Sequence, residues 1–465
     1  MNKRKSAKIN IDNNLRDKRI LVVGFGKSGI AAVHALIRLG VDVSIQDMKK
    51  ESELDRNLIT YFRNHGVTCY LHCVPDDLTI YDQLILSPGV SPELDFIQEA
   101  KANGAEVVGE LEIAFRITKG NYVAITGTNG KTTTTTLVGE IFKKASRKTF
   151  VVGNIGVAVI SESAVAEEGD WLVTETSSFQ LETIRYFKPK ISAILNFSPD
   201  HLNRHHTYQN YIDAKARIFE NQREDGYLIT NFEDENCRRV AEKCRAKVIW
   251  FSDQQEVETG AFVRDGRIVV KNGDGAITDI CSLSDMHIIG AHNVQNVLAA
   301  SAICYFAGIE PEIIGRGIRE FAGVEHRLEY CAEIDGVKYY NDSKGTNTDA
   351  AVTAIKAVGE NIILIAGGDA KQQNFDGFVR EFPGKVKKLI LLGRDAFMIQ
   401  EAADKAGFTD YVVCRNMDEC VKTAFEAAVP GDSVVLSPAC ASWDMYENFE
   451  QRGRHFKDCV RRLES

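Results

Sequence analysis

A loop between residues 126 and 133, Thr-Gly-Thr-Asn-Gly-Lys-Thr-Thr, carries the strongest chemical signal in the sequence. An apolar run typical of a strand, 122–125, precedes it, and a segment with helical periodicity, 134–144, follows it. In such loops the backbone N–H groups hold phosphates, the lysine reaches the β- and γ-phosphates, and the next hydroxyl binds Mg²⁺. The loop departs from the common pattern because Ile125 stands where the first glycine is usual. It predicts a nucleoside triphosphate site built on Lys131 and Thr132.

Polar residues follow three further predicted strands at the points where those strands end. Asn154, Glu175 and His201 come after successive apolar runs in the same part of the chain. Ligands of parallel sheets bind beyond the carboxyl ends of the strands, so we expect these side chains to face the phosphates held by Lys131. Glu175 is expected to bind Mg²⁺, because this ion prefers oxygen ligands.

A second glycine pattern lies near the N-terminus. Gly24-x-Gly26-x-x-Gly29 follows an apolar run, 19–23, and opens a predicted helix, 30–39, with Asp47 about 20 residues further on. This is the fingerprint of a dinucleotide site, in which backbone N–H groups approach a pyrophosphate at the start of a helix. The pattern indicates a diphosphate with a sugar nearby and does not require nicotinamide. The alternative is a tight turn that binds nothing.

Three polar segments of the C-terminal half are further candidates. Asn293 and Asn296 share one face of a predicted helix, where they could contact a nucleotide base or cap the helix. Residues 341–347 and 437–443 each follow a predicted strand at the edge where a parallel sheet binds its ligands. For both segments the alternative is an ordinary loop.

Two groups of possible zinc ligands lack the spacing of a zinc site. Cys69, His72 and Cys73 lie in an apolar segment typical of a strand, and the histidines at 201, 205 and 206 lie in a polar loop. We expect no zinc at either place. Lys215 lies in an amphipathic segment, 211–219, and from that pattern alone we expect a solvated surface lysine.

Composition limits the class of protein. The chain has 465 residues, a net charge of −9 and 11 cysteines. At about 150 residues per domain this length predicts about three domains. The acidic excess disfavours a nucleic-acid or anionic-membrane binder, and there is no apolar run of about 18 residues. An odd number of scattered cysteines favours reduced thiols, so we expect a cytoplasmic protein.

Strand and helix patterns alternate along the whole chain, which indicates an α/β protein with parallel sheets. We predict a Rossmann-like N-terminal domain over residues 1–109, with a helix that begins at Ser91-Pro92. A central domain of the P-loop ATPase type, with a parallel sheet, is expected over 110–323. A second Rossmann-like domain is expected over 324–465.

The motifs together resemble those of the Mur ligases. The segments TGTNGKTT, GNIG, TETSSFQLE, NFSPDHLNRH, GAHNVQN, HRLE, NDSKGTN and LSPACASWDMYENFEQRG occur in the order seen in that family, and the resemblance runs from residue 19 to the C-terminus. The last two motifs most resemble those of members that add D-glutamate to UDP-N-acetylmuramoyl-L-alanine. The resemblance implies that ATP phosphorylates the substrate carboxylate and that the D-glutamate amine attacks the acyl phosphate.

The resemblance also assigns catalytic roles. Lys131 would hold the ATP phosphates, and Thr132 and Glu175 would hold one Mg²⁺. His201 would hold a second Mg²⁺ together with Lys215, which matches a lysine that is carbamylated in the family. This modification turns an ammonium group into an anionic oxygen ligand.

The remaining site residues are assigned by motif to three ligands. For ATP they are Gly127, Thr128, Asn129, Gly130, Lys131, Thr132, Thr133, Asn293, Asn296, Arg327 and Asp342. For the UDP substrate they are Gly26, Ser28, Asp47, Ser87, Pro88, Gly89, Asn154, Ser177 and Gln180. For D-glutamate they are Lys344, Thr346, Lys371, Ser442 and Phe449.

Three alternatives stay open at this point. A nicotinamide-dependent dehydrogenase would explain the turn at Gly24 but neither the loop at Lys131 nor Glu175. A nucleotide-switched binding module would explain the loop but not the D-glutamate motifs. Another Mur-type or a folylpolyglutamate-type amide ligase is the nearest rival, although the latter lacks an N-terminal domain of this kind. We expect a monomer whose third domain closes over ATP.

Overall fold

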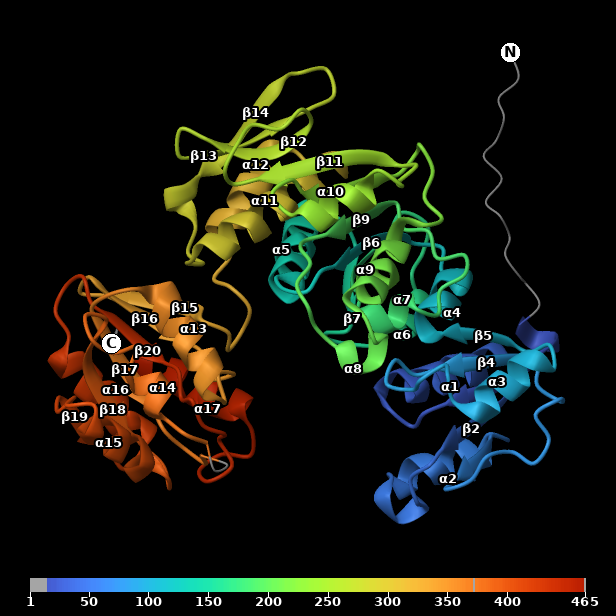
Figure 1. The fold of residues 1–465 in the computed structure, drawn as a ribbon, viewed down its shortest axis with the longest axis horizontal. Coiled ribbons are helices and arrows are strands. Elements are labelled where there is room, and N and C mark those ends of the chain that lie inside the picture. Colours follow the sequence, from blue (N-terminus) through green and yellow to red (C-terminus); the bar gives the residue numbers. More distant parts are fainter. Residues whose placement is uncertain (1–14, 371–372, 464–465) are drawn as a thin grey trace. The chain divides into compact units, whose positions relative to one another are not determined.

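The computed structural model describes residues 15–370 and 373–463, which form three sheets (Figure 1). By internal contacts the chain divides into two compact units. The first comprises the described residues up to Cys281 together with Gln295–Gly317, and it holds the first two sheets. The second comprises Ser282–Val294 and the described residues from Ile318 onward, and it holds the third sheet. The predicted α/β class with parallel sheets is confirmed.

The first sheet has five parallel strands in the order β3-β2-β1-β4-β5, which is a Rossmann-type order. Its strands are β1 (Arg19–Val23), β2 (Asp42–Asp47), β3 (Thr68–Leu71), β4 (Gln83–Leu86) and β5 (Glu106–Gly109), and its helices are α1 (Lys27–Leu39), α2 (Arg56–Asn64) and α3 (Asp95–Ala102). Alternate residues of β1 enter two different cores. Ile20 and Val22 belong to the core that contains residues of α1 and α2, whereas Leu21 and Val23 belong to the core that contains residues of α3. Helices on both faces explain why the strand sequence is continuously apolar.

The second sheet has nine strands in the order β14-β13-β12-β11-β10-β9-β6-β8-β7. Its strands are β6 (Asn121–Thr126), β7 (Thr149–Gly153), β8 (Trp171–Glu175), β9 (Ile191–Ile194), β10 (Tyr227–Asn231), β11 (Lys247–Ser252), β12 (Gly260–Arg264), β13 (Arg267–Lys271) and β14 (Ile277–Ser282). The pairings from β7 to β12 are parallel, and β13 turns back antiparallel on β12. Strand β6 therefore lies between β8 and β9, and all three end at one edge.

Within the described residues, nine α-helices lie between positions 110 and 319 of the chain. They are α4 (Glu110–Ile117), α5 (Lys131–Lys144), α6 (Val159–Ser163), α7 (Ser178–Leu181), α8 (Leu202–His205), α9 (Tyr208–Ala216), α10 (Glu235–Ala241), α11 (Ala291–Phe306) and α12 (Pro311–Arg319). Short 3₁₀ turns are η1 (Leu15–Asp17), η2 (Glu51–Glu53), η3 (Arg217–Phe219) and η4 (Leu283–Asp285). No helix of the described residues is both long enough and apolar enough to span a bilayer.

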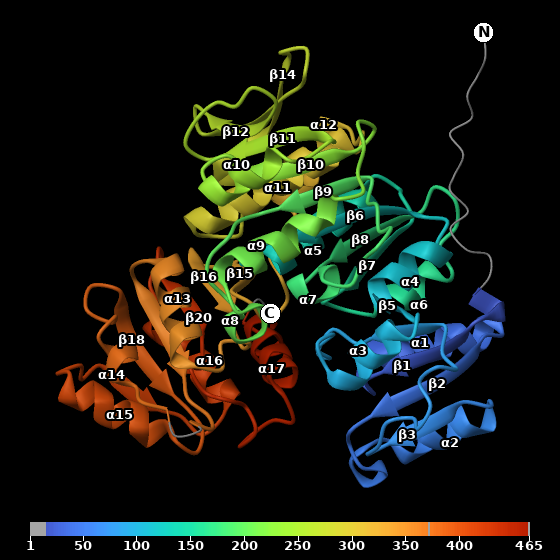
Figure 2. The same ribbon diagram turned by 45° about the vertical axis from the view of Figure 1, so that its right-hand side comes forward.

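The third sheet has six strands in the order β15-β16-β20-β17-β18-β19. Its strands are β15 (Glu329–Ile334), β16 (Val337–Asn341), β17 (Ile362–Ala366), β18 (Val386–Leu391), β19 (Tyr411–Val413) and β20 (Ser433–Leu436), and its helices are α13 (Thr348–Val358), α14 (Asp376–Val379), α15 (Ala396–Lys405), α16 (Met417–Ala427) and α17 (Phe449–Arg461). Leu364 packs into the core with residues of α13, α14 and α15, whereas Ile363 and Ile365 pack with residues of α16 and α17. The sheet is thus covered by helices on both faces, as in the first domain (Figure 2).

One predicted helix start is wrong. The helix expected to begin at Ser91-Pro92 begins at Asp95 instead, and residues 91–94 form a turn. The Ser91 hydroxyl accepts the N–H of Glu93 at 3.2 Å, so it closes this local turn rather than capping a helix. The prediction also missed β15, whose residues are mostly half-buried and do not form an apolar run.

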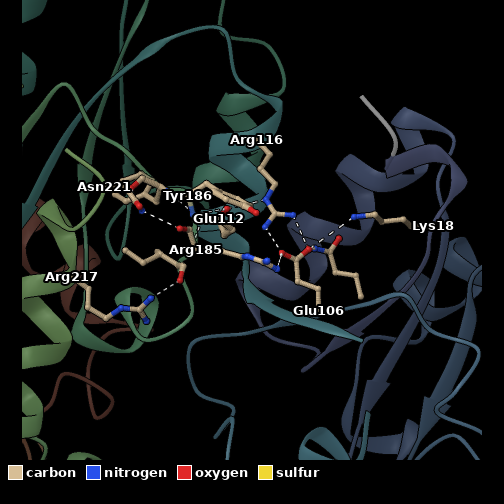
Figure 3. Close-up of polar contacts among 11 residues, drawn as sticks. Lys18, Glu106, Glu112, Arg116, Arg185, Tyr186, Arg217 and Asn221 are labelled. Atoms are coloured by element: carbon tan, nitrogen blue, oxygen red, sulfur yellow. Dashed lines mark hydrogen bonds and ion pairs between the residues drawn. The ribbon is translucent and has the colours of Figure 1, made fainter. Parts of the chain in front are cut away.

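A buried ion-pair network joins the first sheet to the central one within the first unit (Figure 3). Glu112 of α4 accepts the backbone N–H groups of residues 185–187 at 2.8–3.0 Å and the Arg116 guanidinium at 2.9 Å. Arg116 also donates two hydrogen bonds to Glu106 of β5, at 2.7 and 2.9 Å. Arg185 donates to the same carboxylate at 2.8 Å. Strand β5, helix α4 and the segment before β9 are therefore locked together.

This network predicts an acid-sensitive contribution to stability. Hydrogen bonds from Arg116 lower the pKa of Glu106 to about 2, against the opposing effect of its partial burial. Because the pKa of Glu106 is lower in the folded chain than its unfolded value near 4.5, the ionised carboxylate stabilises the fold fully at pH values above 4.5. This contribution disappears as the pH falls toward 2. Glu106→Gln should lower the free energy of unfolding at pH 7 by about 2 kcal/mol, the usual value for hydrogen bonds to a charged group.

Urea unfolding of the parent chain and of Glu106→Gln from pH 7 down to pH 3 tests this prediction. The difference between the two proteins should shrink below pH 4.5. Glu99→Gln, an exposed change on α3, is the matched control and should leave stability unchanged at all pH values. A difference that does not vary with pH would show that the Glu106 charge is not stabilising.

Candidate active site

The loop after β6 delivers the first turn of a helix to the edge of the central sheet. Helix α5 begins at Lys131, three residues earlier than predicted, so the loop and the helix N-terminus form one feature suited to an anion. Gly130 has φ +82°, and a Cβ there would meet the Asn296 side chain at 2.1 Å. Only glycine therefore allows this approach of α11 to the loop. The Thr134 hydroxyl also contacts Asn296, at 3.4 Å.

Two lysines converge on this loop. The Lys131 ammonium donates to the carbonyl oxygens of Gly127 and Thr128, at 2.9 and 2.8 Å. The Lys215 ammonium, from α9, donates to the same Gly127 oxygen at 2.9 Å. Burial, and secondarily the charge of Lys131, lower the pKa of Lys215 to about 7. A sizeable fraction of this amine is therefore neutral at physiological pH.

The expectation that Lys215 is a solvated surface lysine is wrong. The side chain is buried, and it lies 4.7 Å from the centroid of the Tyr211 ring. The tyrosine hydroxyl in turn contacts the Thr128 hydroxyl at 3.0 Å. Tyr211, Ile212 and Ala214 are buried as well, whereas Gln209, Asn210 and Asp213 are exposed, so Lys215 lies on the buried face of this amphipathic helix and not on its solvent face.

Glu175 ends β8 beside this loop and gathers two predicted residues. Its carboxylate is buried and accepts the Thr132 hydroxyl at 2.9 Å on one oxygen and the Asn154 amide at 2.9 Å on the other. A hydroxyl and a carboxylate are hard oxygen donors, the type that Mg²⁺ prefers. Thr132 and Glu175 therefore fit a Mg²⁺ site next to the phosphate loop.

The histidines of the 201–206 segment have separate partners. His201 is half-exposed and lies near Asp200, at 3.4 Å, and near the Phe179 ring. His205 is buried between Ser178, at 2.9 Å, and Glu182, at 3.2 Å, and burial lowers its pKa. His206 faces Glu93 at 3.5 Å. Their imidazoles thus do not share one centre, and the metal role of His201 stays a prediction.

The predicted UDP residues of the first sheet lie around the turn after β1. Asp47 accepts the backbone N–H groups of Phe25 and Lys49, at 2.6 and 2.8 Å. The Ser87 hydroxyl donates to the Gly24 carbonyl at 3.1 Å. A Cβ at Gly29 would meet that same carbonyl oxygen at 2.0 Å, so the glycine is required for the close packing of helix on strand. The glycine fingerprint thus builds a tightly braced turn.

A small cavity connects this turn with the central sheet. Ser87 and Pro88 line it from the first sheet, and Gln180 lines it from α7. Ser177 and Gln180 form a reciprocal cap at the start of α7, which holds both side chains in place. Glu110, which the sequence did not point to, lines the same cavity, and burial raises the pKa of its carboxyl to about 7. Three of the predicted UDP-substrate residues are thus brought together.

The second unit gathers candidate amino-acid and nucleotide residues at the ends of β16 and β20. Asp342 is buried and accepts the Ser437 hydroxyl at 2.7 Å, and burial raises the pKa of its carboxyl to about 6. The Lys344 ammonium lies 5.7 Å from the centroid of the Phe449 ring. The backbone N–H of Thr346 donates to the Lys344 carbonyl. Lys371 lies outside the described residues.

A buried arginine that the sequence analysis did not single out holds these loops together. Arg452 of α17 donates to the hydroxyl and the carbonyl of Ser343, at 3.0 and 2.8 Å, and to the Cys440 carbonyl at 3.1 Å. It thereby joins the segment of Lys344 to the segment of Ser442. Arg452 is part of the final family motif, LSPACASWDMYENFEQRG, and this membership was the one indication of a role. Neither the residue type nor its spacing indicated that the side chain is buried.

Asn293 and Asn296, predicted to share a ligand, lie on opposite sides of the division between the units. Asn293 donates its amide to the Ile289 carbonyl at 2.7 Å, a local contact before α11. The ATP role of Arg327 rests on motif alone, although its charge lowers the pKa of Asp342 against the larger effect of burial.

Comparison with protein families identifies three consecutive domains. Residues 18–109 match the "Mur ligase MurD-like, N-terminal domain", residues 125–304 the "Mur ligase middle domain", and residues 326–440 the "Mur ligase, glutamate ligase domain". The first match covers the turn at Gly24, the second covers Lys131, Glu175 and Lys215, and the third covers Lys344.

Individual relatives are similar over nearly their full length. A UDP-N-acetylmuramoylalanine–D-glutamate ligase of Alkaliphilus oremlandii is 46% identical over 453 residues, which is 97% of this chain and 99% of the relative. The enzyme of the same name from Clostridioides difficile is 45% identical, covering 97% of this chain and 100% of its own.

Solved structures show the same fold at low identity. The UDP-N-acetylmuramate–alanine ligase of Thermotoga maritima has a TM-score of 0.54 at 18% identity and covers 96% of this chain and 99% of its own. A UDP-N-acetylmuramoyl-L-alanyl-D-glutamate–2,6-diaminopimelate ligase has a TM-score of 0.60 at 18% identity, covering 82% and 92%. With three domain matches in order and relatives that are 45–46% identical over almost all of its length, the chain belongs to the Mur ligase family.

Proposed function

We propose that this protein is the ATP-dependent ligase that adds D-glutamate to UDP-N-acetylmuramoyl-L-alanine, a step of peptidoglycan precursor synthesis. The names of its near-full-length relatives support this substrate pair, and so does the MurD-like N-terminal domain. The convergence of Lys131, Thr132 and Glu175 at one edge of the central sheet carries the chemical part of the proposal. We propose that the enzyme works as a monomer in the cytoplasm.

The reaction has two bond-forming steps. A carboxylate oxygen of the UDP substrate attacks the γ-phosphorus of ATP, and ADP leaves with the electrons of the broken bond. The amine of D-glutamate then attacks the acyl carbon, loses a proton, and phosphate leaves as the amide forms. Lys131 holds the transferred phosphate by its positive charge, which stabilises the charge that builds up between two approaching anions.

Thr132 and Glu175 would hold one Mg²⁺ beside the loop, and His201 would hold a second together with the carbamate of Lys215. Mg²⁺ bound there would supply positive charge against the reacting phosphate and carboxylate. The carbamate forms when the neutral Lys215 amine attacks CO₂ and releases a proton. The pKa near 7 supports this step, because only the neutral amine is a nucleophile.

We assign one ligand to each of three domains: the UDP substrate to residues 1–109, ATP to residues 110–323 and D-glutamate to residues 324–465. Ser28, Asp47, Ser87 and the residues around them bind the uridine diphosphate, and Asn154, Ser177 and Gln180 bind the muramoyl part. The 127–133 loop binds the ATP phosphates, and Asn293, Asn296, Arg327 and Asp342 are assigned to the nucleotide by motif as well. Lys344 and Lys371 pair with the two carboxylates of D-glutamate, with Thr346, Ser442 and Phe449 beside them.

Phosphate release from ATP tests the proposal. Release should require UDP-N-acetylmuramoyl-L-alanine and D-glutamate together, and mass spectrometry should find one added glutamyl residue on the UDP product. L-Glutamate and the UDP sugar without alanine serve as matched controls and should support little or no release. Turnover with a folate and L-glutamate, or with a different muramoyl peptide and amino acid, would instead identify the nearest rival ligases.

A further inference from the structure

A cluster of metal-ligating side chains that includes none of the residues assigned above lies between the start of α16 and the second half of α17. Asp418 comes from the first turn of α16, and His455 and Cys459 stand four residues apart on α17. Among the described residues, these three side chains bring their ligand atoms within 4.8 Å of one another. The His455 Nε2 lies 3.1 Å from Asp418 Oδ2, and the Cys459 Sγ lies 3.7 Å from Asp418 Oδ1.

These separations suit a tetrahedral cation. Zinc bonds are about 2.0 Å long to nitrogen or oxygen and about 2.3 Å to sulfur, so neighbouring ligand atoms in a tetrahedron lie about 3.3 to 3.5 Å apart. The separations of 3.1 and 3.7 Å, each to a different oxygen of the Asp418 carboxylate, lie on either side of this range, and small side-chain rotations would bring one oxygen into it. A carboxylate, an imidazole and a thiol form a ligand set typical of zinc rather than of Mg²⁺, which prefers oxygen alone.

The surroundings hold the imidazole in the orientation that a metal needs. The Tyr446 hydroxyl contacts His455 Nδ1 at 3.0 Å, which leaves Nε2 directed at the Asp418 carboxylate. A hydrogen bond on the second ring nitrogen is the usual support for a metal-bound histidine. The thiol is buried and the carboxylate is half-exposed, so the cluster opens to solvent on one side, where a water could complete the coordination.

A positive charge already bridges two of the three side chains. The Arg462 guanidinium donates to Asp418 Oδ1 at 2.7 Å and approaches the Cys459 Sγ at 3.0 Å. Its side chain is 61% exposed, so it can swing into solvent without breaking a core. The guanidinium therefore marks a place where the cluster favours a cation, and it would compete with a metal ion for that place.

We propose that Asp418, His455 and Cys459 form a binding site for a zinc-type divalent cation that links α16 to α17. The site lies on the same helix as Arg452 and Phe449, but it shares no residue with the proposed reaction. Its function is structural. It fixes the C-terminal part of the helix that carries these residues, and its existence does not depend on the proposed ligase activity.

Zinc binding to the full chain tests the proposal. The purified protein is treated with a chelator, dialysed against dilute ZnCl₂ and analysed for bound metal, and it should retain about one equivalent at this site. With Co²⁺ in place of zinc, a thiolate-to-cobalt charge-transfer band should appear. His455→Asn and Cys459→Ala should remove the bound metal, and Cys459→Ala should remove the band. His455 is partly exposed, so its variant should fold normally.

Matched variants separate this site from other metal-binding residues. Cys420→Ala, a change in the same core that leaves the three ligands intact, should keep the band, and so should His201→Asn in the candidate active site. Tyr446→Phe should weaken binding about tenfold, because it removes only the supporting hydrogen bond. Arg462→Gln should tighten binding, because it removes the competing charge.

Three results would overturn the proposal. The first is no bound zinc and no charge-transfer band in the parent chain, in which case the cluster is only an ion-pair network. The second is a band that survives in Cys459→Ala. The third is equal or weaker zinc binding by Arg462→Gln, which would show that the guanidinium and the cation do not share a place.

Discussion

Replacing Lys131 by alanine should lower kcat of the ligase by about 10³-fold or more, because the variant loses the charge that offsets the approach of phosphate and carboxylate. The net charge of the chain is −9, so no general positive field exists to compensate. The Lys131 ammonium donates hydrogen bonds to the carbonyl oxygens of Thr128 and Gly127 in the loop, at 2.8 and 2.9 Å. An alanine side chain can supply neither these hydrogen bonds nor the positive charge. Steady-state phosphate release with all three substrates measures the effect.

A matched control lies on the same helix. Lys143 is an exposed lysine in the last turn of α5, and Lys143→Ala should retain full activity. Thermal unfolding of Lys131→Ala should be close to that of the parent chain, because the change also relieves the repulsion between Lys131 and Lys215. Activity within about tenfold of the parent would mean that Lys131 does not hold the transferred phosphate.

The second large effect concerns Lys215. Lys215→Ala should lower the rate of the ligase reaction by about 10³-fold or more. Acetate or formate should partly restore activity by supplying the missing carboxylate ligand. In the parent chain, removal of dissolved CO₂ should lower activity and bicarbonate should restore it. The cause is local, since burial and the Lys131 charge keep part of the amine neutral near pH 7.

Isotope labelling tests the carbamate directly. With ¹³C-labelled bicarbonate, the parent chain should show a carbamate resonance that Lys215→Ala lacks. Lys188→Ala, a change to an exposed lysine, should keep both the resonance and the activity. Undiminished activity without CO₂ together with no resonance would remove the carbamate from the mechanism. Failed rescue by both small acids would remove the proposed ligand role.

Strands were the most predictable part of the fold. The run 19–23 appears in the structure with the same bounds, because it is short, almost entirely apolar and followed by a glycine turn. Helix starts were less predictable. The Ser91 hydroxyl accepts the N–H of Glu93 within a turn instead of capping a helix. Helix α5 begins at Lys131, directly after Gly130, which adopts a left-handed conformation. Such choices depend on where the chain must go next, which local residue types do not specify.

The sequence by itself determined the chemistry of the phosphate loop, because residue types and spacing between 126 and 133 suffice for it. It also placed Glu175 at the end of an apolar strand, whereas the pairing of that strand with the one before the loop is known only from the structure. Only the tertiary structure decided the state of Lys215, whose ammonium reaches the Gly127 carbonyl across 88 positions of sequence. The same holds for Arg452, which is buried against Ser343. A side chain's pKa and solvation depend on what packs around it, and those neighbours come from distant parts of the chain.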